Sequence, residues 1–141
     1  MHIQPKHGRV FIGRLEHGAD LLEQMNSFCR QNNIRLGIIN VIGAVTCAKM
    51  GYYDQEMKTY TNCVELNQKL EISSCMGNIS IKDGEIFVHA HICLSDFDGK
   101  TYGGHLMPGT HIFAAEFFIQ ELLGPDLVRA KDKDTGLPLW S

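Results

Sequence analysis

Three histidines lie close together in the stretch FVHAHICLSDFDGKTYGGHL, which runs from residue 87 to residue 106. His89 and His91 form an H-x-H pair, and His105 follows two glycines. In a strand, residues two apart point to the same face at a separation of about 7 Å, so the pair aims two imidazoles at one point. Imidazole suits Zn²⁺ and, by ligand type, also Fe, Ni or Cu. The pattern therefore predicts a metal site, provided that His105 reaches the same face.

The register of the hairpin decides whether His105 joins the pair. The turn signal SDFDGK ends one strand, and TYGGHL returns beside it. A five-residue loop over 96–100 sets His91 opposite His105 on one face, whereas a four-residue loop turns His105 to the other face. A glycine bulge at 103–104 is a second route to the first result. Three converging histidines leave at least one open coordination position, which is typical of a reactive or ligand-binding zinc site.

Two other residues bear on what such a site can do. Cys93 lies two residues beyond His91 and is either a fourth ligand that closes the site or a core thiol. A fourth ligand from a neighbouring protomer is the other way to close it. Glu116, the lone acid in FAAEFFI, is the candidate catalytic residue, because a buried carboxylate is costly without a partner. Its alternative is a structural carboxylate that pairs with backbone amides or with an arginine such as Arg9, Arg14 or Arg35.

The elements around the histidines are mostly expected to be strands. The near-alternation of apolar and polar residues in GRVFIGRLEHG predicts a strand that ends at the turn at Gly18. One helix is predicted in ADLLEQMNSFCRQNN, residues 19–33, because its apolar residues recur at helical spacing. Acidic residues suit its first turn and Arg30 suits its last.

Further strands are expected beyond this helix. The segment 35–54 is rich in β-branched residues and carries glycines, which predicts one or two buried strands with a bend. Segments 59–66 and 70–81 have the alternation of strands, and KDGE at 82–85 favours a tight hairpin turn. The segment HIFAAEFFIQELL is apolar on both faces, and its alternation favours a strand over 111–121.

Length and composition indicate one ordered domain. The 141 residues are expected to form a single domain over 1–141, with a core over about 8–124 and a C-terminal tail over 125–141. No apolar stretch approaches the roughly 20 residues of a membrane span, and the N-terminus lacks the apolar core of a signal peptide. The five cysteines are odd in number and form no C-x-x-C. We therefore expect a cytoplasmic protein with reduced thiols and no membrane contact.

The charge pattern bears on nucleic-acid partners. The net charge is −3, and the 13 lysines and arginines are scattered. The segment RAKDKD at 129–134 alternates bases with acids and is interpreted as a solvated surface segment. Non-specific affinity for nucleic acid comes largely from neutralising phosphates with basic residues, so this balance disfavours direct DNA binding.

The sequence resembles the PPC (plants and prokaryotes conserved) domain family in its stand-alone prokaryotic form. The resemblance runs through GRVFIGRLEHGADLLEQM, NVIGAVTCAKMGYYD, the histidine hairpin with the strand before it, AAEFFIQEL and RAKDKDTGLPLW. It implies an α+β fold with a largely antiparallel β-sheet flanked by helices, assembled as a homotrimer. It also implies a metal site on His89, His91 and His105, with zinc as the expected divalent metal.

The resemblance implies less about function. Family members are commonly labelled DNA-binding, a label that rests largely on relatives in which an AT-hook with an R-G-R-P core precedes the domain. This sequence has no such core, so no DNA-contacting residue is carried over. The first hypothesis is a trimeric metal-binding protein of unestablished activity that acts in regulation through protein partners or DNA. The alternative is a small zinc-dependent enzyme, a hydrolase or hydratase that uses the three-histidine site. The sequence identifies no substrate.

Overall fold

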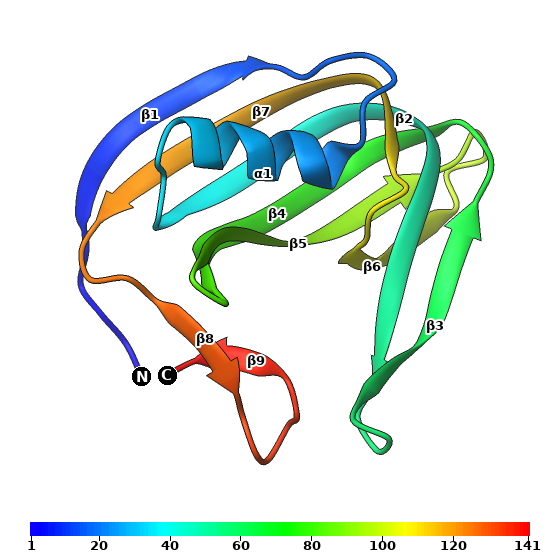
Figure 1. Cartoon of the computed structure of the whole chain (residues 1–141). Helices are drawn as coiled ribbons and strands as arrows, with labels where there is room; N and C mark the ends of the chain where they lie inside the picture. Colours follow the sequence, from blue (N-terminus) through cyan, green and yellow to red (C-terminus); the bar gives the residue numbers. More distant parts are fainter.

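The computed structural model describes residues 1–60 and 63–141. The chain folds into one curved sheet with a helix against it (Figure 1). The elements follow one another as β1 (Lys6–Arg14), α1 (Leu21–Gln31), β2 (Gly37–Asp54), β3 (Thr59–Leu66), β4 (Leu70–Lys82), β5 (Glu85–Ser95), β6 (Thr101–Leu106), β7 (His111–Leu123), β8 (Val128–Lys131) and β9 (Pro138–Trp140). The strands predicted over 111–121 and on both sides of the 82–85 turn are confirmed.

The long strand β2 organises the sheet. Its first half pairs with β4 on one side and β7 on the other, whereas its second half pairs with β3 and, at Met50 and Gly51, with β6. Strands β2, β6, β5 and β4 therefore pair in a closed ring, and β1 extends the sheet beyond β7. The bend expected in this segment lies at Gly43, where φ is 138° and the pairing register shifts. A Cβ there would lie 2.2 Å from the carbonyl oxygen of Ala114, so only glycine fits.

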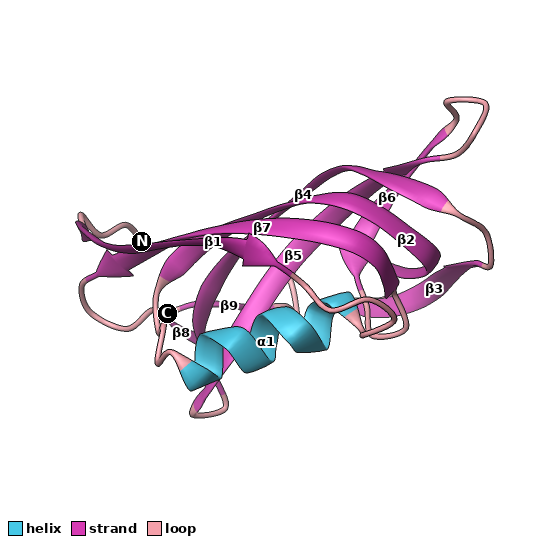
Figure 2. Ribbon diagram, turned by 90° about the horizontal axis from the view of Figure 1, so that it is seen from above, coloured by secondary structure: helices cyan, strands magenta, loops and turns pink.

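The predicted helix is confirmed, but the expectation of a sheet flanked by helices was wrong. In the described part of the chain, α1 is the one helix, and it lies across the concave side of the sheet (Figure 2). Asp20 caps it by accepting a hydrogen bond from the Glu23 amide at 2.9 Å. Leu21, Met25 and Cys29 on its inner face are buried against the strands. The architecture is thus a mostly β single domain with one short helix.

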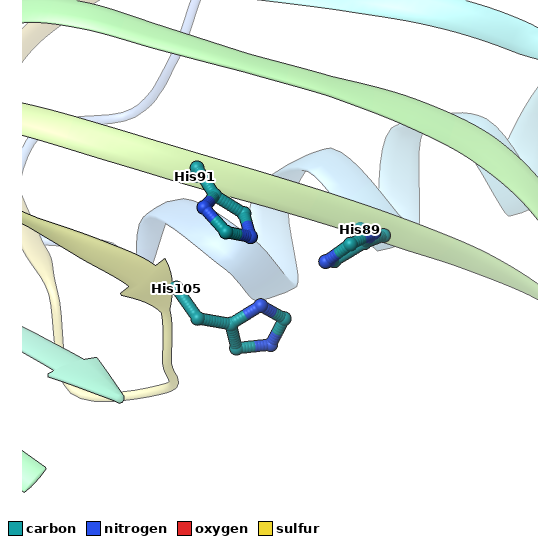
Figure 3. Close-up of side chains that lie close together, drawn as sticks. All are labelled: His89, His91 and His105. Atoms are coloured by element: carbon teal, nitrogen blue, oxygen red, sulfur yellow. The ribbon is translucent and has the colours of Figure 1, made fainter. Parts of the chain in front are cut away.

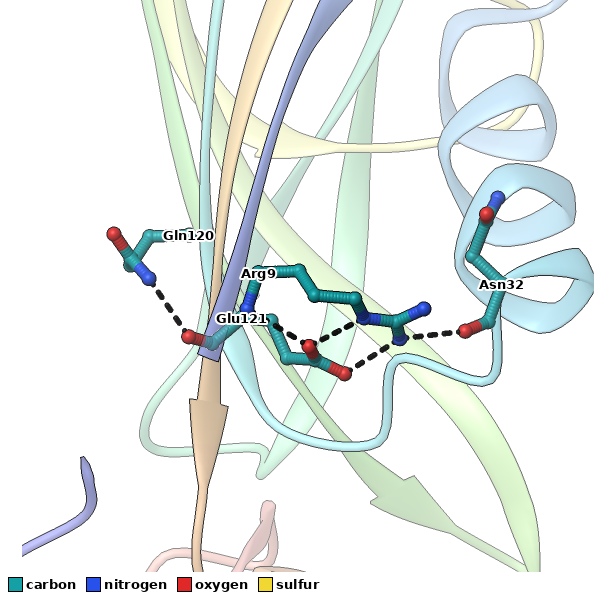
Figure 4. A network of polar contacts seen from close by, with 4 residues as sticks. All are labelled: Arg9, Asn32, Gln120 and Glu121. Carbon is teal, nitrogen blue, oxygen red and sulfur yellow. Dashed lines mark hydrogen bonds and ion pairs between the residues drawn. The ribbon is translucent and has the colours of Figure 1, made fainter. Parts of the chain in front are cut away.

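Arg9 links β1 to β7 by an ion pair and to the end of α1 by a hydrogen bond (Figure 4). Arg9 donates from Nε and Nη2 to the two carboxylate oxygens of Glu121, each at 2.7 Å, and from Nη2 to the Asn32 carbonyl at 2.8 Å. The Arg9 guanidinium holds the pKa of the nearly buried Glu121 carboxyl below its usual range. The acidic partner of Arg9 is therefore Glu121 rather than Glu116.

The C-terminal residues join the sheet as two short strands. β8 pairs in parallel with the end of β4, at Ile81 and Lys82, and β9 pairs antiparallel with β8. All five cysteines are free thiols. In the part of the chain that the structure describes, no helix is both long and apolar enough to span a membrane.

Candidate metal centre

The β5–β6 hairpin sets the register on which the histidine site depends. Ser95 pairs with Thr101 and His91 pairs with His105, which is the five-residue-loop alternative, and the pairing runs without a register shift. Asp96 fixes the loop, since its carboxylate accepts hydrogen bonds from the amides of residues 98 and 100 and from the hydroxyl of residue 102, at 2.9–3.0 Å. The glycine pair therefore does not act through a bulge.

The three histidines converge on the face of β5 that points away from the core (Figure 3). Side chains at 88, 90 and 92 are buried beneath the sheet, so His89 and His91 alternate to the opposite face. The ring centroids of His89, His91 and His105 lie 4.9–5.5 Å apart, and one ligand nitrogen from each ring lies within 4.8 Å of the others. Among the described residues, this group includes neither Cys93 nor Glu116.

Burial keeps two of these imidazoles neutral. Burial lowers the pKa of His89 from its ordinary 6.5 to about 4, helped by the charges of His105, Arg129 and His91. The pKa of His105 falls to about 4 by the same burial, with further contributions from His91, Arg129 and Lys82. At neutral pH both rings are therefore uncharged, as a metal-binding imidazole must be.

A ring nitrogen of His105 has no hydrogen-bond partner among the described residues. Within the described residues, Nδ1 of His105 is a buried polar atom without a hydrogen-bond partner. Buried polar atoms are rarely left unpaired, and a site whose donors are neutral imidazoles suits a borderline metal ion. The residues present thus fit a metal, and His89, His91 and His105 would hold it.

Glycines bring a further aromatic ring to the site. A Cβ on Gly104 would lie 3.0 Å from the carbonyl oxygen of Gly51, so the glycine lets β6 approach β2 closely. A Cβ on Gly51 would in turn lie 3.1 Å from the ring of Tyr60. Tyr60 of β3 consequently packs beside His105, with its ring centroid 5.2 Å away.

Arg129 of β8 is the neighbour that the sequence analysis missed. The interpretation of segment 129–134 as solvated was wrong for this residue, which is 9% exposed. Its Nη2 lies 3.4 Å from Nδ1 of His89, and its guanidinium carbon lies 5.6 Å from the ring centroids of Phe87 and Trp140. The alternation of bases and acids in the sequence carried no signal for this position. Burial of Arg129 depends on β8 pairing beside the end of β4 and on β9 pairing with β8.

Glu116 lies elsewhere on the sheet. It is exposed on β7, opposite Arg14 of β1 and Ile42 of β2, in a shallow hollow of about 530 Å³. Two strands separate β7 from β5, so Glu116 is at least roughly 14 Å from the histidines measured along the sheet, at about 4.8 Å per strand. The structure therefore does not bring Glu116 into the candidate metal centre, and its carboxylate is not buried.

Comparison with known families identifies the fold. The model of the Plants and Prokaryotes Conserved (PCC) domain, also abbreviated PPC, matches residues 2–123. The chain belongs to this family. The matched range includes all three histidines, whereas Arg129 and Trp140 lie beyond it.

Solved structures agree with this PPC assignment. A metal-containing protein from Archaeoglobus fulgidus is 43% identical, with a TM-score of 0.94 over 100% of this chain and 99% of that one. A PPC protein from Pyrococcus horikoshii is 39% identical, with a TM-score of 0.94 over 100% and 96%. A candidate DNA-binding protein from Bacteroides thetaiotaomicron is 25% identical, with a TM-score of 0.85 over 97% and 96%.

Two curated relatives are much longer proteins that align with this chain over part of their length. The bifunctional protein GlmU from one Synechococcus strain is 33% identical over 130 residues, which are 91% of this chain and 20% of that protein. GlmU from a second strain is 30% identical over the same length. The chain spans about a fifth of the length of these relatives, so their bifunctional activity is not assigned to it.

Proposed function

We propose that this PPC domain is a homotrimeric metal-binding module that holds zinc at His89, His91 and His105 and acts in regulation through protein partners. The observation that carries the proposal is the convergence of three ligand nitrogens within 4.8 Å of one another. The lowered pKa values of His89 and His105 and the unpaired Nδ1 of His105 support it. The metal-containing relative from Archaeoglobus fulgidus supports a metal of some kind. Zinc is proposed because it accepts all-imidazole sites without redox chemistry.

The trimer is supported by an uncovered apolar face on β1, β7 and β2. Ile12 lies opposite Phe118, and Phe118 lies opposite Asn40, so these side chains form a row across three strands. Ile12 is 80% exposed and Ile42, in the next row, is 55% exposed. Exposed apolar patches of this kind mark interaction surfaces, and a head-to-tail contact closes into a ring when the rotation permits.

The oligomeric state tests this part directly. Wild-type protein is expected to sediment as a trimer, and Ile12→Glu/Phe118→Glu is expected to sediment as a monomer. Phe97→Glu is the matched control, because Phe97 is fully exposed on the β5–β6 loop, outside these rows. A monomeric wild type, or a double variant that stays trimeric, contradicts the proposed interface.

Direct DNA binding is the weaker form of the regulatory proposal. One similar structure is a candidate DNA-binding protein, but this chain carries a net charge of −3. A DNA-binding surface would need basic side chains pooled by the trimer, and affinity would then fall steeply with salt.

A small zinc-dependent hydrolase or hydratase is the second candidate. The group supplies three protein ligands in the described part of the chain, which leaves a coordination position for water or substrate. A zinc ion in such a site lowers the pKa of its bound water towards 7. Tyr60 and Arg129 line the centre, whereas no carboxylate belongs to the group. The catalytic role of Glu116 stays a prediction, and its position on β7 gives it no support.

Metal content is the experiment that tests the metal proposal. Protein is purified, loaded with zinc, freed of excess and measured by ICP mass spectrometry beside His89→Ala/His105→Ala. We expect about one metal per chain in the wild type and none in the double variant. His2→Ala/His7→Ala is the matched control, since both of these histidines are exposed and lie outside the group. A wild type without metal, or a double variant that retains it, refutes the proposal.

A further inference from the structure

Arg129 is a buried arginine that has no acidic partner among the described residues. It is 9% exposed, and arginines are seldom buried this deeply unless they are paired. The ion pairs found among the described residues do not include it. Its oxygen acceptors are all neutral, namely the Ser80 hydroxyl, the Asn78 side-chain carbonyl and the Pro138 backbone carbonyl, at 2.8–2.9 Å.

These hydrogen bonds fix the guanidinium but do not use all of it. A guanidinium has five N–H groups, and the three neutral oxygens take one each from Nε, Nη1 and Nη2. A fourth N–H faces His89 Nδ1 at 3.4 Å. The fifth, on Nη1, has no acceptor among the described residues. The guanidinium of Arg129 is therefore held in place beside the histidines and keeps one N–H donor without an acceptor among the described residues.

Among the described residues, no ion pair neutralises the positive charge of Arg129. Nη2 of Arg129 lies 3.4 Å from Nδ1 of His89, so the guanidinium charge is adjacent to the histidine group. The histidine group itself contains no carboxylate. A divalent metal on three neutral imidazoles would add two further positive charges. Charges this poorly hydrated are stabilised by an anion that can reach them, and the exposed side of His91 leaves the site open to solvent.

The geometry points to a ligand: we infer that the site binds a small organic carboxylate between the three-histidine metal and the guanidinium of Arg129. This inference rests on the metal centre proposed above. A carboxylate matches both partners, because its oxygens bind zinc and accept charge-assisted hydrogen bonds from arginine. A phosphate carries more acceptor oxygens than a carboxylate, whereas this guanidinium has one N–H without an acceptor among the described residues.

The surroundings also indicate an apolar body on the carboxylate. Phe87 and Trp140 flank the guanidinium, and Tyr60 lies beside His105. Benzoate is therefore a suitable probe, with benzamide as a neutral molecule of nearly the same shape. Inorganic phosphate serves as the competing oxyanion.

Cobalt-substituted protein allows binding to be read from its visible spectrum. We expect a saturable spectral change with benzoate and none with benzamide or with phosphate at the same concentration. Arg129→Gln is expected to raise the benzoate Kd about tenfold or more while cobalt remains bound, since one charge-assisted hydrogen bond is lost. Arg30→Gln is the matched control, because it removes the same charge from the exposed face of α1 and leaves the Kd unchanged.

Several outcomes would overturn the inference. Equal binding of benzamide, tighter binding of phosphate, or an unchanged benzoate Kd in folded Arg129→Gln would each do so. If Arg129→Gln does not fold, the comparison of benzoate with benzamide in wild-type protein tests whether the site requires a carboxylate. If the wild type binds no cobalt, the metal proposal fails separately. In that case the unfolding temperature of metal-free protein is measured with benzoate and with benzamide. A rise with benzoate alone would still support a carboxylate site at Arg129, and no rise would refute the carboxylate site.

Discussion

A methyl group added at Gly77 of β4 should strongly destabilise the fold next to the candidate metal centre. It pairs with Ala90 of β5, and a Cβ on Gly77 would lie 2.2 Å from the carbonyl oxygen of His89 and 2.9 Å from Cα of Ala90. The backbone φ at Gly77 is not positive, so alanine is disfavoured by contact alone. Because the obstructing atoms are backbone, β5 itself must move by about 1 Å.

We expect Gly77→Ala to lower the free energy of unfolding by about 2–3 kcal/mol, the upper part of the range for overpacked cores. For a chain of this length that loss corresponds to a fall in Tm of roughly 5–10 °C. Urea unfolding followed by circular dichroism measures it, and ICP mass spectrometry on the same samples is expected to show reduced metal, since the displaced strand carries His89. The loss should appear in metal-free protein as well, because the clash does not involve the metal.

Gly103→Ala on β6 is the matched control. Its nearest neighbour to an added Cβ is the Ile92 carbonyl oxygen at 3.4 Å, which is ordinary contact, and the residue is exposed. Its free energy of unfolding should stay within about 1 kcal/mol of the wild type. If Gly77→Ala and Gly103→Ala proved equally stable, the argument from close strand contact would be refuted.

Three further predictions concern the same hairpin. The pKa of His89 and of His105 is about 4 in the folded chain, against an ordinary 6.5. As the pH falls, the unfolded chain therefore takes up protons before the folded chain does. Metal-free protein should for this reason lose about 1–2 kcal/mol of its free energy of unfolding between pH 6.5 and pH 4, after allowance for solvent screening. Urea titrations with a chelator present measure this loss, and His89→Gln/His105→Gln should remove most of it. Zinc at about 100 times its Kd should raise the free energy of unfolding by about 2.7 kcal/mol in the wild type but not in His89→Ala/His105→Ala, as thermal unfolding would show. Asp96→Ala removes two hydrogen bonds within the loop and one from the Tyr102 hydroxyl of β6. It should cost about 1–3 kcal/mol and lower metal occupancy, whereas unchanged occupancy would show that the strands alone set the register.

The sequence was informative wherever local pattern and local structure agree. Asp20 and the apolar period after it predicted α1, and Asp83 and Gly84, both with φ near the left-handed region, form the turn expected at KDGE. The alternation of residues 111–121 predicted β7 correctly although both of its faces are apolar. That second apolar face is explained by side chains such as Phe118, which are exposed on the outer side of the sheet.

The prediction of the histidine group depended on one choice of loop length. Two residues two apart on a strand share a face by geometry, so His89 and His91 needed no further information. His105 did, because a loop one residue shorter would have turned it to the other side. The deciding contacts come from Asp96, whose carboxylate accepts two loop amides and the Tyr102 hydroxyl, and sequence alone does not reveal that the same side chain serves all three.

Arg129 shows why the remainder of the site could not be predicted. In sequence it stands in a run where bases and acids alternate, and such runs are normally solvated. Its burial arises because β8 pairs in parallel with the end of β4, a contact between residues nearly fifty positions apart that leaves no periodic trace in so short a strand. The same pairing places a rigid guanidinium against His89. The three histidines could thus be found from the hairpin sequence, whereas the position of the guanidinium beside them depends on a pairing between distant parts of the chain.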